Sequence, residues 1–349
     1  MLNVSVTGRS VVFCFRRDGL LSAVSAVLCS GRIGLLSVVS TGSSAVRRFP
    51  AGKMGVACRL AILVLLTACH QGGGALVFQS DFGLKDGAVS AMKGVAYGVS
   101  PELALFDLTH EIPAYNIWEA AYRLEQTAPY WPKGTVFVSV VDPGVGTERK
   151  SVVMLSRSGH YFVTPDNGTL TLVAQSLGIA AVREIDEAVN RRQQSGGSYT
   201  FHGRDVYAYT GARLAAGVIS FEQVGRLLPD SVVKIPYQPA SRKDQRLLGG
   251  IPILDIQYGN VWTNIPDSLV QAQGWKAGDS VQATIFRSGD TVWRGRVPFV
   301  HTFGEVPEGS PMAYLNSLMN FSLAINMGSF ADSFGVRSGP EWRVELDKW

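Results

Sequence analysis

From Ala75 onward the chain alternates short apolar runs with longer amphipathic segments, and this alternation restricts the folds open to it. The runs ALVFQS, LALFDLT and GTVFVSVVD are typical of buried strands, and the segments 86–99 and 117–128 have helical patterns. Strands that alternate with helices predict a mainly parallel sheet in an α/β domain. Such a sheet binds ligands in the crevice outside the carboxyl ends of its strands. We therefore expect functional residues at those ends.

The pattern changes after Val233, which indicates a second domain. Before this point SVVMLS, HYFVTP and AAVREI predict further strands, and 166–178 and 205–216 predict further helices. After it come a polar, proline-containing stretch and then short strand-like runs at close spacing, as in small barrels and sandwiches. The expected organisation is an α/β domain with a mainly parallel, Rossmann-like sheet at 75–235, a linker at 236–249 and a small all-β, barrel-like domain at 250–349.

Positive charge and cysteine are concentrated in the first 69 residues. Residues 1–68 contain eight basic residues and one acid, so of the formal net charge of +4 the remainder of the chain carries −3. A nucleic-acid partner would require clustered Lys and Arg in the folded part, and this class of partner is excluded. All 4 cysteines precede residue 70, so the folded part has no disulfide and no thiolate metal site.

Residues 59–70, RLAILVLLTACH, are typical of an export signal. A basic residue and the apolar run 60–66 precede Leu-Thr-Ala-Cys, which resembles the lipobox of a bacterial lipoprotein signal peptide. The run is too short for a membrane span of ~20 residues. The resemblance implies a leader at 1–68, a lipid on Cys69 and a flexible tether at 69–74. The alternatives are a buried helix with a chance cysteine, or an uncleaved anchor.

The leader also bears on the chain start and on location. Met54 would begin a compact signal peptide, so residues 1–53 are interpreted as the product of an overextended start codon. A processed leader places the protein in the bacterial cell envelope, held at the membrane by the lipid on Cys69. No Asp follows this cysteine, which favours the periplasmic side of the outer membrane in a two-membrane organism. An unprocessed leader leaves the protein cytoplasmic.

Polar clusters follow the predicted strands of the α/β domain. A lone Asp there is more often a helix cap or turn former, and a lone His beside Gly is more often structural. Four such clusters in one domain nevertheless favour a shared crevice. They contain Asp81 and Asp86; Asp107 and His110; Asp142 and Arg149; and His202, Arg204 and Asp205.

The third cluster lies in VDPGVGTERK, which superficially resembles a phosphate-binding loop. It lacks the Gly-Lys-Ser/Thr ending, and strand character resumes directly after it, so no helix N-terminus faces an anion. Pro143 and Gly144 instead predict a turn that fixes Asp142 at the strand end. An Asp, an Arg and a His together can orient and deprotonate a water, because the Arg keeps the carboxylate ionised.

A series of motifs resembles those of the S-adenosyl-L-methionine (SAM) hydroxide adenosyltransferases. In chain order they are SDFGLKDGAVSAMKGV, DLTHEIPAYNIWEAAYRL, PKGTVFVSVVDPGVGTER, YFVTPDNGTL and TFHGRDVYA, followed by DIQYGNVWTNI and AYLNSLMNFSLAINMGS. These SAM hydrolases are related to fluorinases and chlorinases. The resemblance runs from about Ala75 to the C-terminus. It implies attack of water on C5′ of SAM, which gives adenosine and L-methionine. SAM is then the substrate, and no cofactor or metal is expected.

The resemblance assigns roles residue by residue. The water-activating triad falls on Asp142, Arg149 and His202, and an Asp in place of the halogenases' tyrosine favours hydroxide over halide. Substrate-binding roles fall on the remaining positions: Asp81 on the ribose hydroxyls, Tyr115 along the nucleoside, Tyr258 and Asn260 at the adenine, and Asp255 and Ser317 at the methionine, with Asp86 as a helper. Tyr115 and Tyr258 as core aromatics, Asn260 as a turn former and Asp86 as a helix cap are the alternatives.

The chain differs from the related halogenases at several positions, and the resemblance also predicts how subunits assemble. Leu318 stands where the halogenases have an arginine on the methionine carboxylate, and Ala88 replaces a serine. The linker KIPYQPA lacks an asparagine that the halogenases use near the ribose. Family members are trimers with active sites between the N-terminal domain of one subunit and the C-terminal domain of the next, so we expect a homotrimer. Two alternative functions remain open: an exported hydrolase of another 5′-substituted nucleoside, and a non-catalytic lipoprotein that binds adenosine or SAM.

Overall fold

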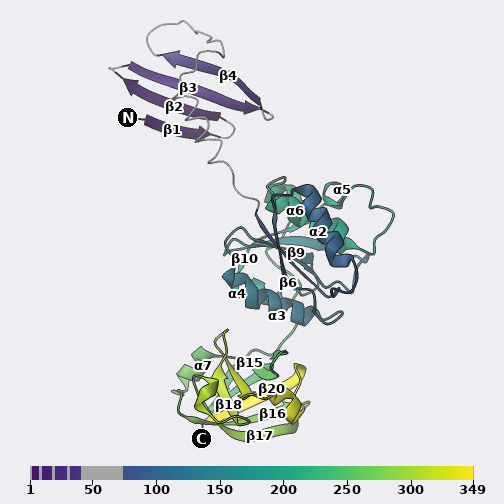
Figure 1. Cartoon of the computed structure of the whole chain (residues 1–349), viewed down its shortest axis with the longest axis vertical. Coiled ribbons are helices and arrows are strands. Elements are labelled where there is room, and N and C mark those ends of the chain that lie inside the picture. The colour runs from purple at the N-terminus through teal and green to yellow at the C-terminus, as the bar shows by residue number, and fades with distance from the viewer. Residues whose placement is uncertain (1, 8–9, 18–19, 30–31, 41–73, 349) are drawn as a thin grey trace. The chain divides into compact units, whose positions relative to one another are not determined.

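The computed structural model describes residues 2–7, 10–17, 20–29, 32–40 and 74–348, and the chain forms two compact units, Met1–Gln71 and Gly72–Trp349 (Figure 1). Within the described residues of the first unit, four strands pair antiparallel in chain order: β1 (Leu2–Thr7), β2 (Ser10–Arg17), β3 (Leu20–Cys29) and β4 (Arg32–Ser40). No domain was predicted here, although the many valines favour strands locally. Cys69 and the predicted tether up to Gly73 lie outside the described residues, so the leader remains a prediction.

The second unit begins with an α/β domain whose sheet has the strand order β11-β10-β8-β9-β7-β5-β6. Its central strands are parallel: β5 (Ala75–Ser80) pairs with β6 (Ala104–Thr109) and β7 (Val136–Val140), and β7 pairs with β9 (Tyr161–Pro165). The other strands join antiparallel: β8 (Ser151–Ser156), β10 (Ile179–Glu184) and β11 (Leu227–Leu228). This mostly parallel, mixed sheet confirms the predicted fold class.

Helices cover both faces of this sheet (Figure 1). The face with Leu76 and Val138 packs against α2 (Ala88–Val99), the π-helix η2 (Gly203–Ala208) and α6 (Tyr209–Ala215). The face with Val77 and Phe137 packs against α3 (Ile117–Thr127) and α4 (Thr171–Ser176). Neighbouring strand residues serve opposite cores because successive side chains alternate between the faces. The short helices η1 (Ala128–Tyr130), α5 (Glu187–Asn190) and η3 (Phe221–Val224) connect these elements.

The helix predicted at 166–178 is shorter than expected, because residues before Thr171 form a turn. Asn167 Oδ1 accepts hydrogen bonds from Thr169, and Gly168 has a φ of 111°. A left-handed backbone and a local side-chain acceptor both compete with helix formation. Only α4 itself remains helical in this segment.

The C-terminal domain consists of two antiparallel sheets that share one core, as predicted. Val281, Ile285 and Val344 from the first sheet meet Val261 and Leu323 from the second. The first sheet contains β12 (Ser241–Lys243), β13 (Arg246–Ile251), β20 (Gly339–Lys348), β16 (Ser280–Arg287) and β17 (Asp290–Pro298). The second contains β14 (Ile253–Asp255), β15 (Asn260–Pro266), β19 (Asn320–Ile325) and β18 (Pro311–Leu315). Short helices complete it: α7 (Asp267–Ala272), η4 (Phe303–Glu305) and α8 (Phe330–Phe334).

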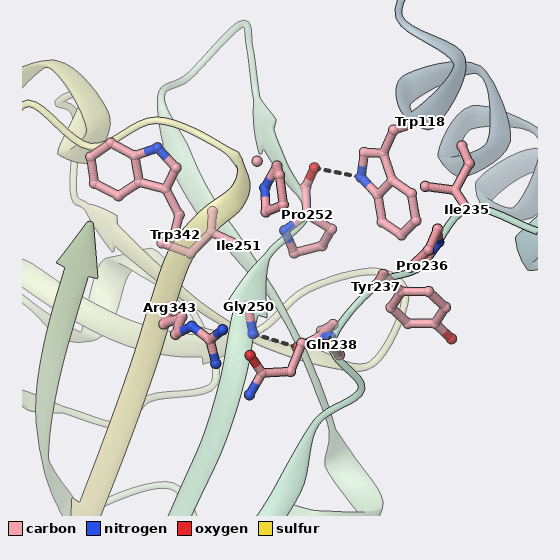
Figure 2. Close-up of a pocket in the computed structure, with 13 residues that line it drawn as sticks. Trp118, Ile235, Pro236, Tyr237, Gln238, Gly250, Ile251, Pro252, Trp342 and Arg343 are labelled. Atoms are coloured by element: carbon pink, nitrogen blue, oxygen red, sulfur yellow. Dashed lines mark hydrogen bonds between the residues drawn. The ribbon is translucent and has the colours of Figure 1, made fainter. Parts of the chain in front are cut away.

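Helix α3 and the linker meet the C-terminal domain at a largely apolar cavity of about 490 Å³ (Figure 2). Trp118 Nε1 donates a hydrogen bond to the carbonyl of Pro252 at 2.9 Å, and its ring lies 5.3 Å from that of Tyr237 in the linker. Strands β12 and β13 begin inside the predicted linker 236–249, so the irregular connection is shorter than expected.

Candidate active site

The turn after β7 brings Asp142 and Arg149 together. Arg149 Nε donates to Asp142 Oδ1 at 2.9 Å and Nη2 donates to Oδ2 at 2.5 Å, which is a bidentate pair. The side chain of Arg149 is 12% exposed and that of Asp142 is 6% exposed. Backbone hydrogen bonds from Val145 to Asp142 and from Thr147 to Gly144 close the turn. The predicted geometry of VDPGVGTERK, a turn and not a phosphate loop, is therefore present.

The hydrogen bond and charge of Asp142 keep Arg149 ionised. Burial acts to lower the pKa of Arg149, but the hydrogen bond and charge of Asp142 outweigh it, so the pKa lies above its ordinary value. Tyr207 is fully buried, and burial next to Asp142 raises the pKa of its hydroxyl strongly. The Tyr207 hydroxyl therefore keeps its proton; it lies 3.4 Å from Asp142 Oδ2 and 3.1 Å from Ser151 Oγ.

His202 lies immediately before η2 and is 4% exposed. Its Nε2 lies 3.1 Å from Nη2 of Arg191, and its Nδ1 is buried without a hydrogen-bond partner in the described part of the chain. The next residue is Gly203, where an added Cβ would lie 3.1 Å from Val140 Cγ1 and 3.2 Å from the Phe82 ring. The missing side chain lets the His202 segment approach the end of β7.

A cavity of about 280 Å³ joins these residues to the end of β5. Asp81, Tyr115, Asp142 and His202 all line it. The backbone N–H of Tyr115 donates to Asp81 Oδ2 at 2.9 Å, and Tyr115 has a left-handed φ of 68° and a side chain that is 73% exposed. A bulky residue adopts this conformation only when its surroundings enforce it, and such strain clusters at functional sites.

The other predicted strand-end residues have structural partners. Asp86 Oδ1 accepts from the N–H of Ala88 at 2.8 Å at the start of α2, which is the contact of a helix-capping residue. His110 lies between Ser80 Oγ at 2.7 Å and Asp107 Oδ1 at 3.0 Å. Asp205 is buried and accepts hydrogen bonds from Arg192 and Arg204. None of these residues lines the 280 Å³ cavity.

A second cavity, of about 730 Å³, lies in the C-terminal domain and is lined by Asp255, Tyr258, Asn260 and Ser317. Asn260 Nδ2 donates to Asp255 Oδ2 at 3.1 Å, while Asn260 Oδ1 is buried without a partner among the residues described. No residue lines both this cavity and the one at Asp142. Within one chain, the predicted site residues therefore form two separate groups.

Three further polar residues, one lining the second cavity and two beside His202, were not predicted from the sequence. Asn316 lines the second cavity; its Oδ1 accepts from Leu318 and Asn320, and its Nδ2 is buried without a partner within residues 74–348. Glu187 and Arg191 form an ion pair beside His202. Glu187 and Arg191 are four residues apart, as in an ordinary ion pair on a helix surface, so the sequence pattern does not indicate a functional role.

A buried carboxylate–guanidinium pair, beside a histidine nitrogen that has no partner among the described residues, is typical of an enzyme active site. Within residues 74–348 no group of three His, Asp or Glu side chains is suited to hold a metal ion. Models of the SAM hydroxide adenosyltransferase N-terminal and C-terminal domains match residues 76–225 and 249–343. The chain belongs to the SAM hydroxide adenosyltransferase family, as its motifs predicted.

Individual relatives agree with this assignment. The chain is 36% identical to an (R)-S-adenosyl-L-methionine hydrolase of Thermus thermophilus over 76% of its own length and 98% of the relative's. It is 28% identical to a fluorinase of Actinopolyspora mzabensis over 77% and 96%. The crystal structure of an uncharacterized conserved protein from Thermotoga maritima superposes with a TM-score of 0.73 at 32% identity, covering 78% of this chain and 99% of that one.

Proposed function

We propose that this protein hydrolyses SAM at C5′ to adenosine and L-methionine. The observation that carries the proposal is the Asp142–Arg149 pair, because Asp142 lines one cavity together with His202 and Asp81. The curated hydrolase relatives support it. An oxygen–carbon bond forms at C5′, the carbon–sulfur bond breaks with its electron pair on sulfur, and the water proton passes to Asp142 and then to solvent.

The side chains around Asp142 have separate roles in the proposed reaction. Arg149 fixes the orientation of Asp142, so the carboxylate is positioned to accept a proton from water. His202 contacts the same water, and Asp81 binds the ribose hydroxyls through its two oxygens. Hydroxide and sulfonium neutralise each other in the transition state, so an enclosed site of low polarity favours the displacement.

The second cavity would bind the rest of the substrate. Among the described residues, Asn260 Oδ1 is an acceptor without a partner and Asn316 Nδ2 is a donor without one. Asp255 would supply a carboxylate for the methionine ammonium. An unpaired buried polar atom is costly, and substrate would relieve this cost. Leu318 packs with an apolar cluster and brings no cation, so Asn316 and Ser317 would hold the methionine carboxylate.

The two cavities would form one site in a homotrimer, between the N-terminal domain of one subunit and the C-terminal domain of the next. Large side chains around both cavities support this: Tyr115, Tyr258 and Met327 are 73%, 66% and 82% exposed. Exposed apolar surface of this kind marks interaction sites. The measurement is mass by light scattering, and a monomer that turns over SAM would contradict the shared site.

We also retain the proposal of a lipoprotein, anchored through Cys69 and located in the cell envelope. It rests on the lipobox-like LTAC after a short apolar run. Mass spectrometry of the mature N-terminus tests it: a diacylglycerol adduct on Cys69 is expected, and an unmodified chain that starts at Met1 would contradict the anchor.

The decisive experiment is incubation of the full chain with SAM, chromatography of the products, and a parallel halide competition. We expect adenosine and methionine in equal amounts and no halogenated nucleoside. Turnover of another 5′-substituted nucleoside but not of SAM would favour the first alternative, an exported hydrolase of different specificity. Tight adenosine binding without turnover of any substrate would favour a binding lipoprotein.

A further inference from the structure

Four side chains surround the His202 ring: Arg191, Glu187, Tyr199 and Tyr207. Arg191 Nη2 lies 3.1 Å from His202 Nε2, and Arg191 is itself held by Glu187 Oε2, at 2.9 Å from Nε and 2.8 Å from Nη2. The guanidinium lies over the Tyr199 ring at 4.6 Å. The His202 ring centre lies 6.2 Å from that of Tyr199 and 6.5 Å from that of Tyr207. These contacts fix where the guanidinium can donate.

The hydrogen bond that Arg191 donates to Nε2 determines which ring nitrogen of His202 carries the proton. An arginine has five N–H donors and no acceptor, so a hydrogen bond between Arg191 and Nε2 requires the lone pair of Nε2. The alternative partner, Glu187 Oε1, lies 3.6 Å from Nε2, which is beyond hydrogen-bond length. In the neutral imidazole the proton then lies on Nδ1, which is the buried atom without a described partner.

We propose that Arg191, anchored by Glu187, is a positioning residue that holds His202 as its Nδ1–H tautomer, so that His202 donates a hydrogen bond to the attacking water. This inference rests on the proposed SAM hydrolysis. The water oxygen keeps one lone pair for C5′ and accepts from Nδ1–H with the other. One water proton then points to Asp142, so Asp142 is the base and His202 orients the nucleophile.

Glu187 gives Nε2 of His202 a second possible partner. Nε2 can either accept a hydrogen bond from Arg191 or, when protonated, donate one to Glu187. Glu187 pairs with Nε and Nη2 of Arg191 and is a carboxylate in that ion pair. Without Arg191, Nε2 would take the proton and donate to Glu187. Nδ1 would then be an acceptor and could no longer donate a hydrogen bond to the water oxygen.

The tautomer is measured directly by long-range ¹H–¹⁵N correlation of the full chain with ¹⁵N-labelled histidine, and His202→Gln assigns the signals. In the unaltered protein we expect Nδ1 protonated and Nε2 unprotonated. Arg191→Gln should reverse this pattern. The matched control is Arg226→Gln, because Arg226 also pairs with a glutamate, Glu184, but on the sheet edge. It should leave the His202 signals unchanged.

Turnover supplies the second measurement. Arg191→Gln should lower kcat by roughly 10-fold to 100-fold, within the contribution of a positioned proton-handling group, while KM changes about 2-fold or less. Arg191→Lys should restore the wild-type tautomer and part of kcat, because an ammonium also only donates. Thermal unfolding of each variant separates loss of positioning from loss of fold.

The outcomes separate this inference from the proposed function. A protonated Nε2 in the unaltered protein overturns the inference, whatever the turnover. A reversed tautomer in Arg191→Gln with unchanged kcat overturns the positioning role. The expected tautomers in a protein that does not cleave SAM would overturn the proposed function and leave the assignment of the proton at His202 in place.

Discussion

The cavity at Asp142 and the cavity at Asn260 differ in how completely a carboxylate or an amide side chain is hydrogen-bonded within the chain. At Asp142 both carboxylate oxygens are paired with one guanidinium, and the pair is almost wholly buried. At Asn260 and Asn316 one amide atom of each is bonded and the other is left without a partner among the residues described. The first cavity is preorganised by the chain itself, as reaction chemistry requires. The second has hydrogen-bonding capacity that a ligand would complete.

The largest expected effect comes from neutralising the preorganised cavity. Asp142→Asn keeps an acceptor for Arg149 Nε but removes the charge and the base. We expect kcat for SAM to fall by about 10²–10⁴-fold, with adenosine binding retained. Adenosine release and adenosine titration measure the two quantities. Activity within about 10-fold of the unaltered protein would mean that Asp142 is not the base.

Gly203→Ala tests how tightly His202 is held against the end of β7. The added Cβ would lie 3.1 Å from Val140 and 3.2 Å from Phe82, so we expect a loss of about 1–3 kcal/mol in the free energy of unfolding and a lower kcat. The control is Gly94→Ala inside α2, where no atom lies within 4 Å of the new Cβ. It should be neutral or stabilising by up to ~1 kcal/mol in a urea titration. Equal effects would show that the close approach is unimportant.

Asn316→Asp tests the free donor of the second cavity. The aspartate keeps the acceptor for the Leu318 and Asn320 amides but replaces Nδ2 by an oxygen. We expect KM for SAM to rise about 10-fold, equivalent to ~1.4 kcal/mol for a lost hydrogen bond, with a smaller change in kcat. Gln257→Glu adds the same charge at an exposed position of the same cavity. An equal rise in KM there would attribute the effect to charge alone.

The smallest effect is on acid stability. The pKa of Glu187 is lowered from 4.5 to about 2 in the folded protein, so its contribution to stability is present above about pH 4.5 and is lost as the pH falls towards 2. Glu187→Gln should therefore reduce stability near neutral pH and make it less dependent on pH between these values. Urea unfolding at several pH values measures both. An unchanged pH dependence would show that the pKa of Glu187 is not lowered in the folded protein.

Local patterns located the catalytic candidates but not the residues that support them. Asp81, Asp142 and His202 follow strand ends or precede a helix, and one turn returns Arg149 to Asp142. Arg191 has the spacing of an ordinary surface pair with Glu187, and its contact with His202 depends on how the segment between α5 and η2 folds back. Asn316 looked like any turn residue, because only a count of its partners in three dimensions shows that Nδ2 is free. The shorter helix at α4 likewise follows from a side-chain turn that competes with a helical pattern.

The amino-acid sequence was enough to predict the alternation of strands and helices, the change to an all-β domain, the family, and the charged residues at the strand ends. These depend on periodicity and on short motifs, which are local properties of a chain. The tertiary structure sets which charges are paired and which amide atoms have no partner among the described residues. Hydrogen bonds depend on distances of about 3 Å between residues far apart in the sequence, and only the folded chain sets those distances.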